Sequence, residues 1–419
     1  MPRDNSNEPA VRIEPPAFLM EPELAAVMAA LPEARVIGGA VRDTLADAEV
    51  AEIDLATPRQ PGEVTEALQA AGIRAVPTGL QHGTVTAVAG GRGFEVTTLR
   101  RDVATDGRHA VVAFTDDWRE DAARRDFTIN AMSLTRTGDV YDYFGGIGDL
   151  RAGIVRFVGE PATRIAEDYL RILRFFRFHA TYGQGAPDPQ ALAACVAGRA
   201  GLEQLSRERI RMELLKLVAG RRAPAALAVM TDCGLLDLVL AGVPLIASFA
   251  KMVELEASFG LSPDPVRRLG ALVVCVIEDA ERLRERLRTS NAEYERLYSM
   301  AEGWRDIGPA WDEQRARVLL YRLGPDRFTD RVLLAWARSS QGLGDLGDPS
   351  WATLATLPAR WIAPRFPLKA ADFIKRGLPC GPALGAALAA AEEAWTAAGF
   401  PLEPEALAAI ADAASRRVL

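Results

Sequence analysis

One stretch of this chain, Val36–Thr57, constrains its fold more than any other. Its sequence is VIGGAVRDTLADAEVAEIDLAT. β-Forming residues lead into a pair of glycines, a short helix-forming segment follows, and an apolar-alternating segment ends the stretch. This order predicts a strand, a glycine turn, a helix and a second strand.

The turn and the second strand both point to chemistry with phosphates. A glycine turn that opens a helix, here at Gly38 and Gly39, leaves backbone N–H groups and the positive end of the helix dipole for a phosphate. Glu52 and Asp54 are spaced i, i+2, so on a strand their carboxylates would project to one side and share divalent cations. Each feature alone is more often a simple turn or a solvated strand face. Together they are what Mg²⁺-dependent nucleotidyl transfer requires.

A predicted β-hairpin supplies a third carboxylate. Residues 82–90 and 93–100 alternate as strands do, and Gly90-Gly91 joins them. Glu95 would then lie on a strand beside the one that carries Asp54, although on its own it is equally typical of an exposed strand residue. Residues 100–120, which follow, are charged and show little periodicity, so they predict a mobile loop.

Two later segments are dense in charged side chains. In RRDFTINAM, residues 124–132, the adjacent arginines offer guanidinium groups to a triphosphate, and Asp126 can accept a hydrogen bond from a ribose hydroxyl. From Pro161 the hydrophobic period becomes helical. Asp168, Arg171 and Arg174 then recur every three residues along a mostly apolar helix. Such a polar ridge forms either a salt-bridge network or the wall of a pocket, and the residues alone favour the network.

In order and spacing, these motifs resemble those of one family. G-G-x-V-R-D with I-D-L-A-T, then R-R-D-F-T-I-N-A-M, E-D-x-x-R-x-x-R-x-x-R-F and S-x-E-R-I-x-x-E-L, resemble the class II tRNA nucleotidyltransferases and bacterial poly(A) polymerases of the polymerase-β-like nucleotidyltransferase superfamily. The resemblance is dense over residues 36–222 and fainter in the C-terminal tail. It implies an α+β fold, in which an N-terminal nucleotidyltransferase head with a small mixed sheet precedes an all-α neck, body and tail.

The resemblance also implies how the chain is divided. We expect a flexible arm over residues 1–21, a catalytic head over 22–150 and a neck for nucleobase recognition and RNA contact over 151–222. A helical body over 223–340 and a helical tail over 341–419 would follow.

For function, the resemblance implies template-independent addition of CCA to the 3′ end of tRNA from CTP and ATP, with release of pyrophosphate. The implied catalytic residues are Glu52, Asp54 and Glu95, of which Glu52 and Asp54 would hold two Mg²⁺ ions. The implied nucleotide-binding residues are Gly38, Gly39, Arg42, Asp43, Arg125, Asp126, Glu167, Asp168, Arg171, Arg174 and Arg177. Basic residues expected to contact RNA are Arg199, Arg207, Arg211, Arg221 and Arg222.

Three alternatives stay open at this point. The motifs do not separate CCA addition from poly(A) synthesis or from addition of the terminal A alone. The family's metal pair is D-x-D, whereas the first position here is Glu52, whose extra methylene shifts the carboxylate by about 1.5 Å. A catalytically impaired tRNA-binding homologue is therefore the third alternative.

Composition adds context for these predictions. At 419 residues the chain is too long for a single core. Its net charge of −7 is uneven, since residues 1–150 hold 14 basic and 24 acidic side chains whereas residues 151–222 hold 13 and 7. This distribution is compatible with metal binding in the first segment and phosphate contact in the second. No apolar run has the length of a membrane span or signal peptide, and the four cysteines lie far apart, so we expect a cytoplasmic protein.

Overall fold

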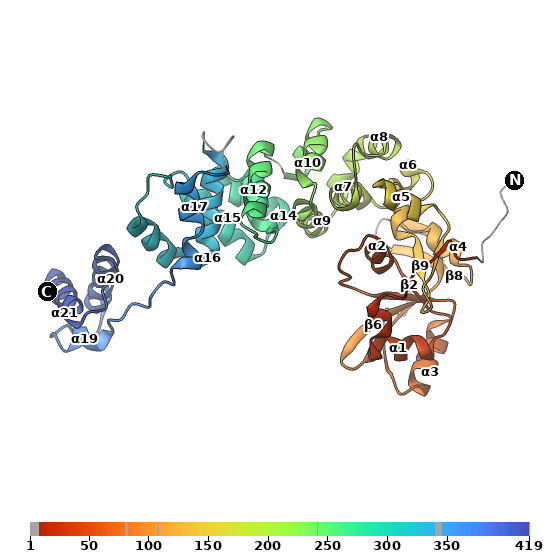
Figure 1. The fold of residues 1–419 in the computed structure, drawn as a ribbon, viewed down its shortest axis with the longest axis horizontal. Coiled ribbons are helices and arrows are strands. Elements are labelled where there is room, and N and C mark those ends of the chain that lie inside the picture. Colours follow the sequence, from red (N-terminus) through yellow and green to blue (C-terminus); the bar gives the residue numbers. More distant parts are fainter. Residues whose placement is uncertain (1–7, 80–82, 107–108, 241, 340–345, 419) are drawn as a thin grey trace. The chain divides into compact units, whose positions relative to one another are not determined.

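The structure is a computed structural model that describes residues 8–79, 83–106, 109–240, 242–339 and 346–418. The chain divides into two compact units (Figure 1). Unit 1 comprises Met1–Pro244 and Arg286–Arg288, and unit 2 comprises Leu245–Glu285 and Thr289–Leu419. The finer division into head, neck, body and tail stays a prediction, and its boundary at residues 340–341 lies outside the described residues.

Unit 1 begins with a mixed sheet in the order β1-β10-β9-β2-β3-β6-β5-β4. The β3–β6 pair is parallel, and the other pairs of this sheet are antiparallel. The strands are β1 (Val11–Arg12), β2 (Arg35–Ile37), β3 (Asp54–Thr57), β4 (Arg74–Gly79), β5 (Thr84–Ala89), β6 (Arg92–Thr98), β9 (Met132–Leu134) and β10 (Asp139–Asp142).

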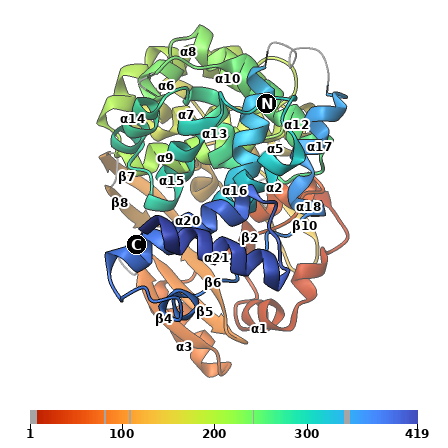
Figure 2. The same ribbon diagram turned by 90° about the vertical axis from the view of Figure 1, so that its left-hand side faces the viewer.

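Helices cover one face of this sheet, and the core between them includes Ala40 and Val41 of α2 (Gly39–Leu45). Helices α1 (Pro22–Ala30) and α3 (Pro61–Ala70) lie beside β5, as Figure 2 shows. Their buried leucines and valines share a core with Leu55 of β3 and Val96 of β6. Because successive side chains of a strand point to opposite faces, the neighbours of these two residues, Asp54 and Glu95, point away from that core.

Two segments differ from the sequence-based expectation. Residues 100–120, predicted to be a loop, instead contain an antiparallel ribbon of β7 (Arg100–Asp106) and β8 (His109–Phe114) and the start of α4 (Trp118–Ala123). Backbone pairing between neighbouring strands needs no apolar periodicity, which is the signal that the prediction used. Residues 8–21, placed in the flexible arm, contribute β1 and the 3₁₀ helix Ala17–Met20, whose Leu19 is buried; residues 1–7 lie outside the described residues.

Helices make up the rest of unit 1. They are α2 (Gly39–Leu45) between β2 and β3, then α5 (Gly146–Ala152), α6 (Pro161–Glu167), α7 (Leu170–Tyr182), α8 (Pro189–Ala197), α9 (Arg207–Ala219), α10 (Ala223–Asp232) and α11 (Leu236–Leu240). Helix α7 packs against both α9 and α10, and its Phe175, Phe176 and Phe178 are buried. This packing places the polar residues of α7 beside α9.

All the secondary-structure elements assigned to the described residues of unit 2 are helices, and loops join them. Its helices are α12 (Ile246–Ser258), α13 (Pro265–Val273), α14 (Ile277–Leu287), α15 (Asn291–Gly303), α16 (Glu313–Arg338), α17 (Pro349–Ala355), α18 (Leu357–Arg360), α19 (Ala370–Ile374), α20 (Pro382–Ala397) and α21 (Pro404–Val418). The predicted α+β fold, with a mixed sheet followed by helices, is confirmed. Within the described ranges, no helix is both long and apolar enough to cross a membrane.

Candidate active site

The predicted glycine turn lies at the start of α2. Gly38 has φ +66°, a backbone conformation that glycine adopts without strain, and it precedes the first residue of the helix. A Cβ atom on Gly38 would lie 3.1 Å from Nη1 of Arg125, so a side chain here would also crowd that guanidinium group. The turn therefore brings backbone N–H groups and Arg125 to one place.

The predicted carboxylates gather at the edge of β3 and β6. Asp54 and Glu95 are register partners in the parallel pair, which confirms that Glu95 lies on the strand beside Asp54. Glu52 does not lie on that strand, because β3 begins at Asp54; the prediction of two carboxylates on one strand was wrong in this detail. The pKa of Asp54 is raised by enclosure of its carboxylate and, to a lesser degree, by repulsion from Glu95 and Glu52.

A cavity of about 740 Å³ connects this acidic edge to the helices of the same unit. Glu52 and Asp54 line it, and Glu95 is not among its lining residues. Within the described part of the chain, nine basic and four acidic residues line the cavity. The full set is Gly38, Gly39, Arg42, Glu52, Asp54, Arg100, Arg124, Arg125, Asp126, Asn130, Asp168, Leu170, Arg171, Arg174, Arg177, Phe178, Arg209 and Lys216.

Arg42 is held at the cavity by several partners. Its guanidinium group donates to Asn130 at 2.6 Å and to both carboxylate oxygens of Asp43, at 2.9 and 3.0 Å. It also lies over the ring of Tyr182, 4.5 Å from the centroid, and the Tyr182 hydroxyl donates to Asp43. Asp43, predicted to bind nucleotide, does not line the cavity; in the structure it orients Arg42.

Asp126 is also engaged by protein groups. One of its oxygens accepts from the backbone N–H of Phe127 and the side chain of Asn130, and the other accepts from Arg174 at 2.6 Å. Burial alone would raise the pKa of Asp126, but the charge of Arg174 and these hydrogen bonds lower it overall. Asp126 therefore fixes Arg174, a role that the ribose-binding prediction did not include.

The polar ridge is not on one continuous helix. Helix α6 ends at Glu167, and Asp168 has an extended backbone (φ −158°, ψ 107°) before α7 begins at Leu170. The Asp168 carboxylate accepts from the Leu170 N–H at 3.1 Å, a local bond that competes with helix continuation. Asp168 and Arg171 are therefore not one turn apart on a helix, as the sequence predicted, although both line the cavity.

Ion pairs hold the residues of this ridge in place. Arg209 of α9 donates to Asp168 at 2.6 Å, and Glu213, one turn further along α9, pairs with Arg177 at 2.8 Å and Arg174 at 3.7 Å. Arg171 donates to the carbonyl oxygen of Arg164 at 2.7 Å and to Glu167, which does not line the cavity. The ridge is thus both a salt-bridge network and a cavity wall.

Several functional candidates were missed from the sequence. Arg209 and Glu213 stand i, i+4 in the S-x-E-R-I-x-x-E-L motif, so the motif itself was the available signal. Asn130 belongs to R-R-D-F-T-I-N-A-M, where its partner Arg42 could not be recognised because 88 residues separate the two. Arg100 also lines the cavity, and no periodic pattern marks it. Arg124, the first of the two adjacent arginines that the sequence offered to a triphosphate, lines the cavity as well.

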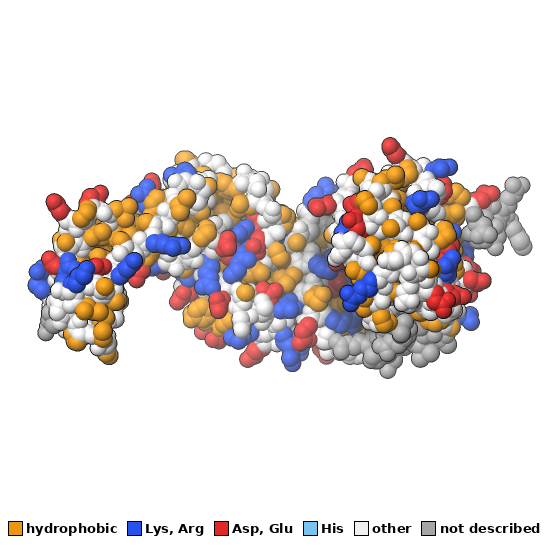
Figure 3. All heavy atoms as spheres, turned by 90° about the horizontal axis from the view of Figure 1, so that it is seen from below, with side chains coloured by type: hydrophobic (Ala, Val, Ile, Leu, Met, Phe, Trp, Pro, Cys, Tyr) orange, Lys and Arg blue, Asp and Glu red, His pale blue; other side chains and the backbone are white. Residues whose placement is uncertain are grey.

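The five arginines expected to contact RNA have unequal surroundings. Arg199 and Arg221 are exposed and Arg207 is half-buried, whereas Arg211 donates to the carbonyl oxygen of Arg288 and Arg222 to that of Gly183, both at 2.9 Å. On the face drawn in Figure 3, basic and acidic side chains are interspersed over the described surface. Charge by sequence segment therefore does not by itself mark out an RNA-binding surface.

The acidic edge suits a hard divalent cation. Its donors are carboxylate oxygens, and the mutual repulsion that raises the pKa of Asp54 is what a cation would relieve. Among the described residues, no group of three or more His, Cys, Asp or Glu side chains is arranged to hold a metal ion alone. Glu52 and Asp54 could therefore hold a cation only together with ligands from outside this group, such as phosphate oxygens or water.

Comparison with known proteins decides the family. Residues 34–156 match the poly(A) polymerase head domain, and residues 186–249 match a probable RNA- and SrmB-binding site of polymerase A. The chain is 37% identical over 379 residues to the mitochondrial CCA tRNA nucleotidyltransferase 1 of Mus musculus, covering 90% of this chain and 85% of that protein. The chain belongs to the CCA tRNA nucleotidyltransferase family.

Further relatives of the family agree. A CCA-adding enzyme of Limosilactobacillus fermentum is 32% identical over 361 residues, covering 85% of this chain and 86% of that protein. The crystal structure of the Bacillus stearothermophilus CCA-adding enzyme in complex with CTP matches with a TM-score of 0.70 and 26% identity, covering 95% of this chain and 99% of the other. The Thermotoga maritima CCA-adding enzyme, solved with tRNA, shares the fold with a TM-score of 0.66 and 18% identity.

These comparisons confirm the predicted family and enzyme class. Nucleotidyltransferases of this kind generally use divalent metal ions. The mouse and human relatives are both named as mitochondrial, so the expectation of a cytoplasmic protein stays a prediction.

Proposed function

We propose that this protein adds C, C and A to the 3′ end of tRNA, taking the nucleotides from CTP and ATP and releasing pyrophosphate without a nucleic-acid template. One observation carries the proposal: a single cavity joins the Gly38 turn, the carboxylates at β3 and the polar residues Asp168 and Arg171. The names of the relatives and the CTP complex of the Bacillus enzyme support it.

The triphosphate would bind at the turn. The glycine turn at Gly38 and Gly39 lines the cavity together with Arg42 and Arg125, and the lining has an excess of positive charge. Asp43 and Asn130 hold Arg42 in a fixed orientation, so little side-chain entropy is lost when the phosphates bind.

Glu52 and Asp54 would hold the catalytic Mg²⁺, which we propose as a two-ion site. When bound, the ions would stabilise charge that develops on the phosphate and favour ionisation of the RNA 3′-hydroxyl. Glu95, the register partner of Asp54, would accept the proton of that hydroxyl as it attacks the α-phosphate in line. Glu52 lies before β3, and its side chain is one methylene longer than that of an aspartate. Its carboxylate could therefore reach the same ion as Asp54.

The base would be selected by Asp168 and Arg171. Cytosine presents an amino group beside a ring-nitrogen acceptor, and adenine presents the same pair, so a carboxylate and a guanidinium group complement both bases. Guanine and uracil present a carbonyl and an N–H at those positions, and both contacts become repulsive. Arg209, which donates to Asp168, would hold the carboxylate in a fixed orientation at the cavity.

Nucleotide incorporation tests this function against its alternatives. We expect tRNA transcripts that end at the discriminator base, at −C and at −CC to be completed to CCA with CTP and ATP together. Addition of A alone would indicate an A-adding enzyme, and long A tails would indicate a poly(A) polymerase. No addition would indicate an impaired tRNA-binding homologue. In the same assay Glu52→Asp should keep or raise activity, whereas wild-type activity of Glu52→Ala would exclude Glu52 as a ligand.

The RNA would contact the basic surface of residues 151–222. We expect charge reversal at the exposed Arg199 and Arg221 to weaken tRNA binding and flatten its salt dependence, since phosphate neutralisation releases counterions. Reversal at Arg207 should act in the same direction. Arg211 and Arg222 also hold backbone carbonyls, so their variants should lose stability as well. Salt dependence unchanged in all five would place the RNA elsewhere.

A further inference from the structure

A buried carboxylate lies directly behind the arginine wall of the cavity. Asp121 of α4 is only 3% exposed and does not line the cavity. It accepts hydrogen bonds from Nε of Arg124 at 2.8 Å, from Nη2 of Arg125 at 3.2 Å and from the backbone N–H of Arg100 at 3.3 Å. All three donors belong to residues that do line the cavity.

The two neighbouring arginines need such a partner. Arg124 and Arg125 carry like charges on adjacent residues in a cavity where basic groups already outnumber acidic ones. Without a counter-charge their repulsion would separate them and turn them towards solvent. Asp121 offers one oxygen to Arg124 and the other to Arg125. Because it is buried, water cannot take its place.

The bond to Asp121 also decides which way Arg125 faces. A guanidinium group has five donors in a fixed plane, so engaging Nη2 fixes the direction of the others. Nη2 of Arg125 is taken by Asp121, and Nη1 lies beside Gly38, 3.1 Å from where a Cβ atom would stand. The backbone of the same pair is held separately, since Arg164 donates to the carbonyl oxygens of Arg124 and Arg125.

We infer that Asp121 is a positioning residue that aims Arg124 and Arg125 at the triphosphate of the incoming nucleotide. The inference rests on the proposed function, which gives these arginines their substrate. Because Asp121 acts on the phosphate end of the cavity, its effect should be the same for CTP and ATP. The choice between bases, which involves Asp168 and Arg171, should not depend on it.

Asp121→Asn tests this inference. The amide has nearly the same size but turns an N–H donor towards guanidinium donors, so one arginine loses its acceptor. We expect KM for both CTP and ATP to rise about tenfold, the size of one lost charge-assisted hydrogen bond, with a smaller change in kcat. Inhibition by pyrophosphate should weaken by the same factor, and preference for C and A over U and G should stay at the wild-type value.

Asp149→Asn is the matched control. Asp149 is another buried carboxylate of unit 1; it accepts from Thr128 at 2.7 Å and pairs with Arg156, and it does not line the cavity. We expect this variant to lose thermal stability with no change in KM. Asp121→Glu should give KM values between those of the wild type and Asp121→Asn, because a carboxylate is restored at a shifted position.

The outcomes separate this inference from the proposed function. If the wild-type protein adds no nucleotide to tRNA, the proposed function fails, and pyrophosphate affinity measured by calorimetry still tests Asp121. A folded Asp121→Asn with wild-type pyrophosphate affinity and wild-type KM would overturn the inference. If Asp121→Asn does not fold, Asp121→Glu decides in its place: wild-type values overturn the inference, and an equal rise of KM for both nucleotides supports it.

Discussion

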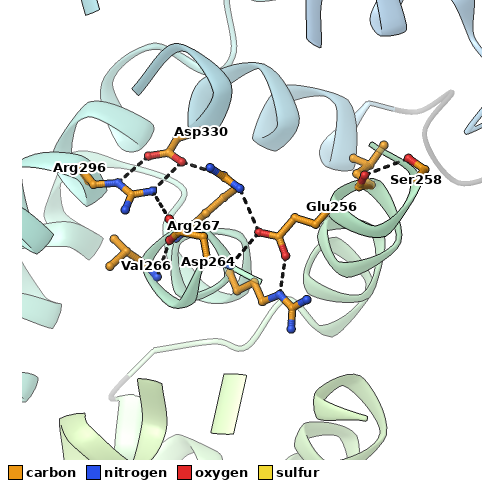
Figure 4. Close-up of polar contacts among 9 residues, drawn as sticks. Glu256, Ser258, Asp264, Val266, Arg267, Arg296 and Asp330 are labelled. Atoms are coloured by element: carbon orange, nitrogen blue, oxygen red, sulfur yellow. Dashed lines mark hydrogen bonds and ion pairs between the residues drawn. The ribbon is translucent and has the colours of Figure 1, made fainter. Parts of the chain in front are cut away.

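Two groups of charged side chains, one in each unit, form similar ion pairs but differ in how their charges are balanced. In unit 1 nine basic and four acidic residues line the cavity, and four further acids pair with its arginines from outside the lining: Asp43, Asp121, Glu167 and Glu213. In unit 2 the α16 network, shown in Figure 4, has three of each sign: Glu256, Asp264, Asp330, Arg267, Arg268 and Arg296. We infer from this difference that the first group binds a ligand and that the second stabilises the packing of helices.

The α16 network closes on itself. Asp330 of α16 is fully buried and accepts from Arg267 at 2.8 Å and from Arg296 at 2.8 Å. Glu256 of α12, which is 1% exposed, accepts from Arg267 at 3.1 Å and Arg268 at 2.6 Å. These pairs join α12, α13, α15 and α16, and every charge has its partner within the protein. Such a network specifies how four helices pack and offers nothing to a ligand.

The cavity group, by contrast, has charged side chains that face a space in which a ligand could bind. Its acidic members hold particular arginines, as Asp126 holds Arg174, and the excess positive charge faces the cavity. At the ends of β3 and β6, Glu95 and Glu52 both repel Asp54. Excess positive charge is what a triphosphate neutralises, and clustered carboxylates are what a cation neutralises. Excess charge on the residues that line a cavity therefore distinguishes the proposed binding site from the α16 network in this molecule.

The largest expected effect is on catalysis at the acidic edge. Asp54→Ala should lower nucleotide incorporation by about a thousandfold or more, because a lost metal ligand removes stabilisation of the transition state. Glu95→Ala should also abolish incorporation. The tRNA dissociation constant and the melting temperature should change little in both. Glu49→Ala, an exposed acid in the loop before β3, is the control and should behave as the wild type. If Asp54→Ala kept substantial activity, the cluster of carboxylates at β3 and β6 would have no role in catalysis.

The next effect should fall on stability rather than catalysis. Asp330→Asn leaves Arg267 and Arg296 buried with a weakened partner, which we expect to cost about 3–5 kcal/mol of unfolding free energy. Thermal and urea denaturation would measure it, and activity per folded molecule should be unchanged. Glu295→Gln, which breaks the exposed pair with Arg327, should cost below about 1 kcal/mol. If Asp330→Asn were as stable as the wild type, the closed network would not be a scaffold.

Much of the arrangement of the cavity residues could be predicted from the sequence. The glycine turn and the position of Glu95 beside Asp54 follow from the turn residues and the strand period. The pocket at Asp168 and Arg171 was implied only by the family resemblance, since the residues alone favoured a salt-bridge network. The α16 network could not be predicted, because its members come from four helices and no local pattern links Glu256 to Asp330. Long-range partners depend on how helices pack, and the sequence carries no periodic sign of that packing.

Three further differences between the predicted and the observed elements concern where the elements begin and end or whether they were predicted at all. The helix break at Asp168 arises because its side chain binds the Leu170 N–H, a choice that helical periodicity does not reveal. The β7–β8 ribbon forms without apolar alternation, and β3 begins at Asp54 although EIDLA reads as alternating from Glu52. The hydrophobic pattern therefore located the helical segment and β3 but not their limits, and it did not reveal the β7–β8 ribbon.

A smaller effect should separate selectivity from activity within the cavity group. Asp168→Ala should discriminate against UTP and GTP about 10- to 100-fold less well than the wild type, because each mispaired polar group costs about 1–3 kcal/mol. Arg171→Ala should lower incorporation of CTP and ATP alike. Arg209→Gln should lose less discrimination than Asp168→Ala, since the carboxylate remains but is less firmly held. Single-nucleotide incorporation with all four triphosphates measures this, with the exposed Arg151→Gln as control. If Asp168→Ala kept the wild-type selectivity for C and A, the ridge would be only a structural salt-bridge network, like the α16 network.

The smallest expected effect concerns the charge of one acid in the α16 network. Asp264 accepts from the backbone N–H groups of Val266 and Arg267 at the start of α13 and from Arg296 at 2.9 Å. Burial, the largest single influence, would raise the pKa of Asp264, but these hydrogen bonds and charges lower it overall. Asparagine also caps helices well, so Asp264→Asn removes mainly the charge. We expect a loss of about 1 kcal/mol at pH 7.

The pH dependence of that loss identifies its cause. A carboxylate whose pKa is lower in the folded chain than in the unfolded chain stabilises the fold above the unfolded pKa of about 3.9. That stabilisation disappears as the pH falls through the lower, folded value. The difference between the wild type and Asp264→Asn should therefore be constant near neutral pH and shrink below about pH 4. Asp348→Asn is the matched control: Asp348 caps α17 through the N–H groups of Ser350 and Trp351, and the described residues give it no ion pair. If the loss of unfolding free energy in Asp264→Asn were the same at low pH, the charge of Asp264 would not be what stabilises this network.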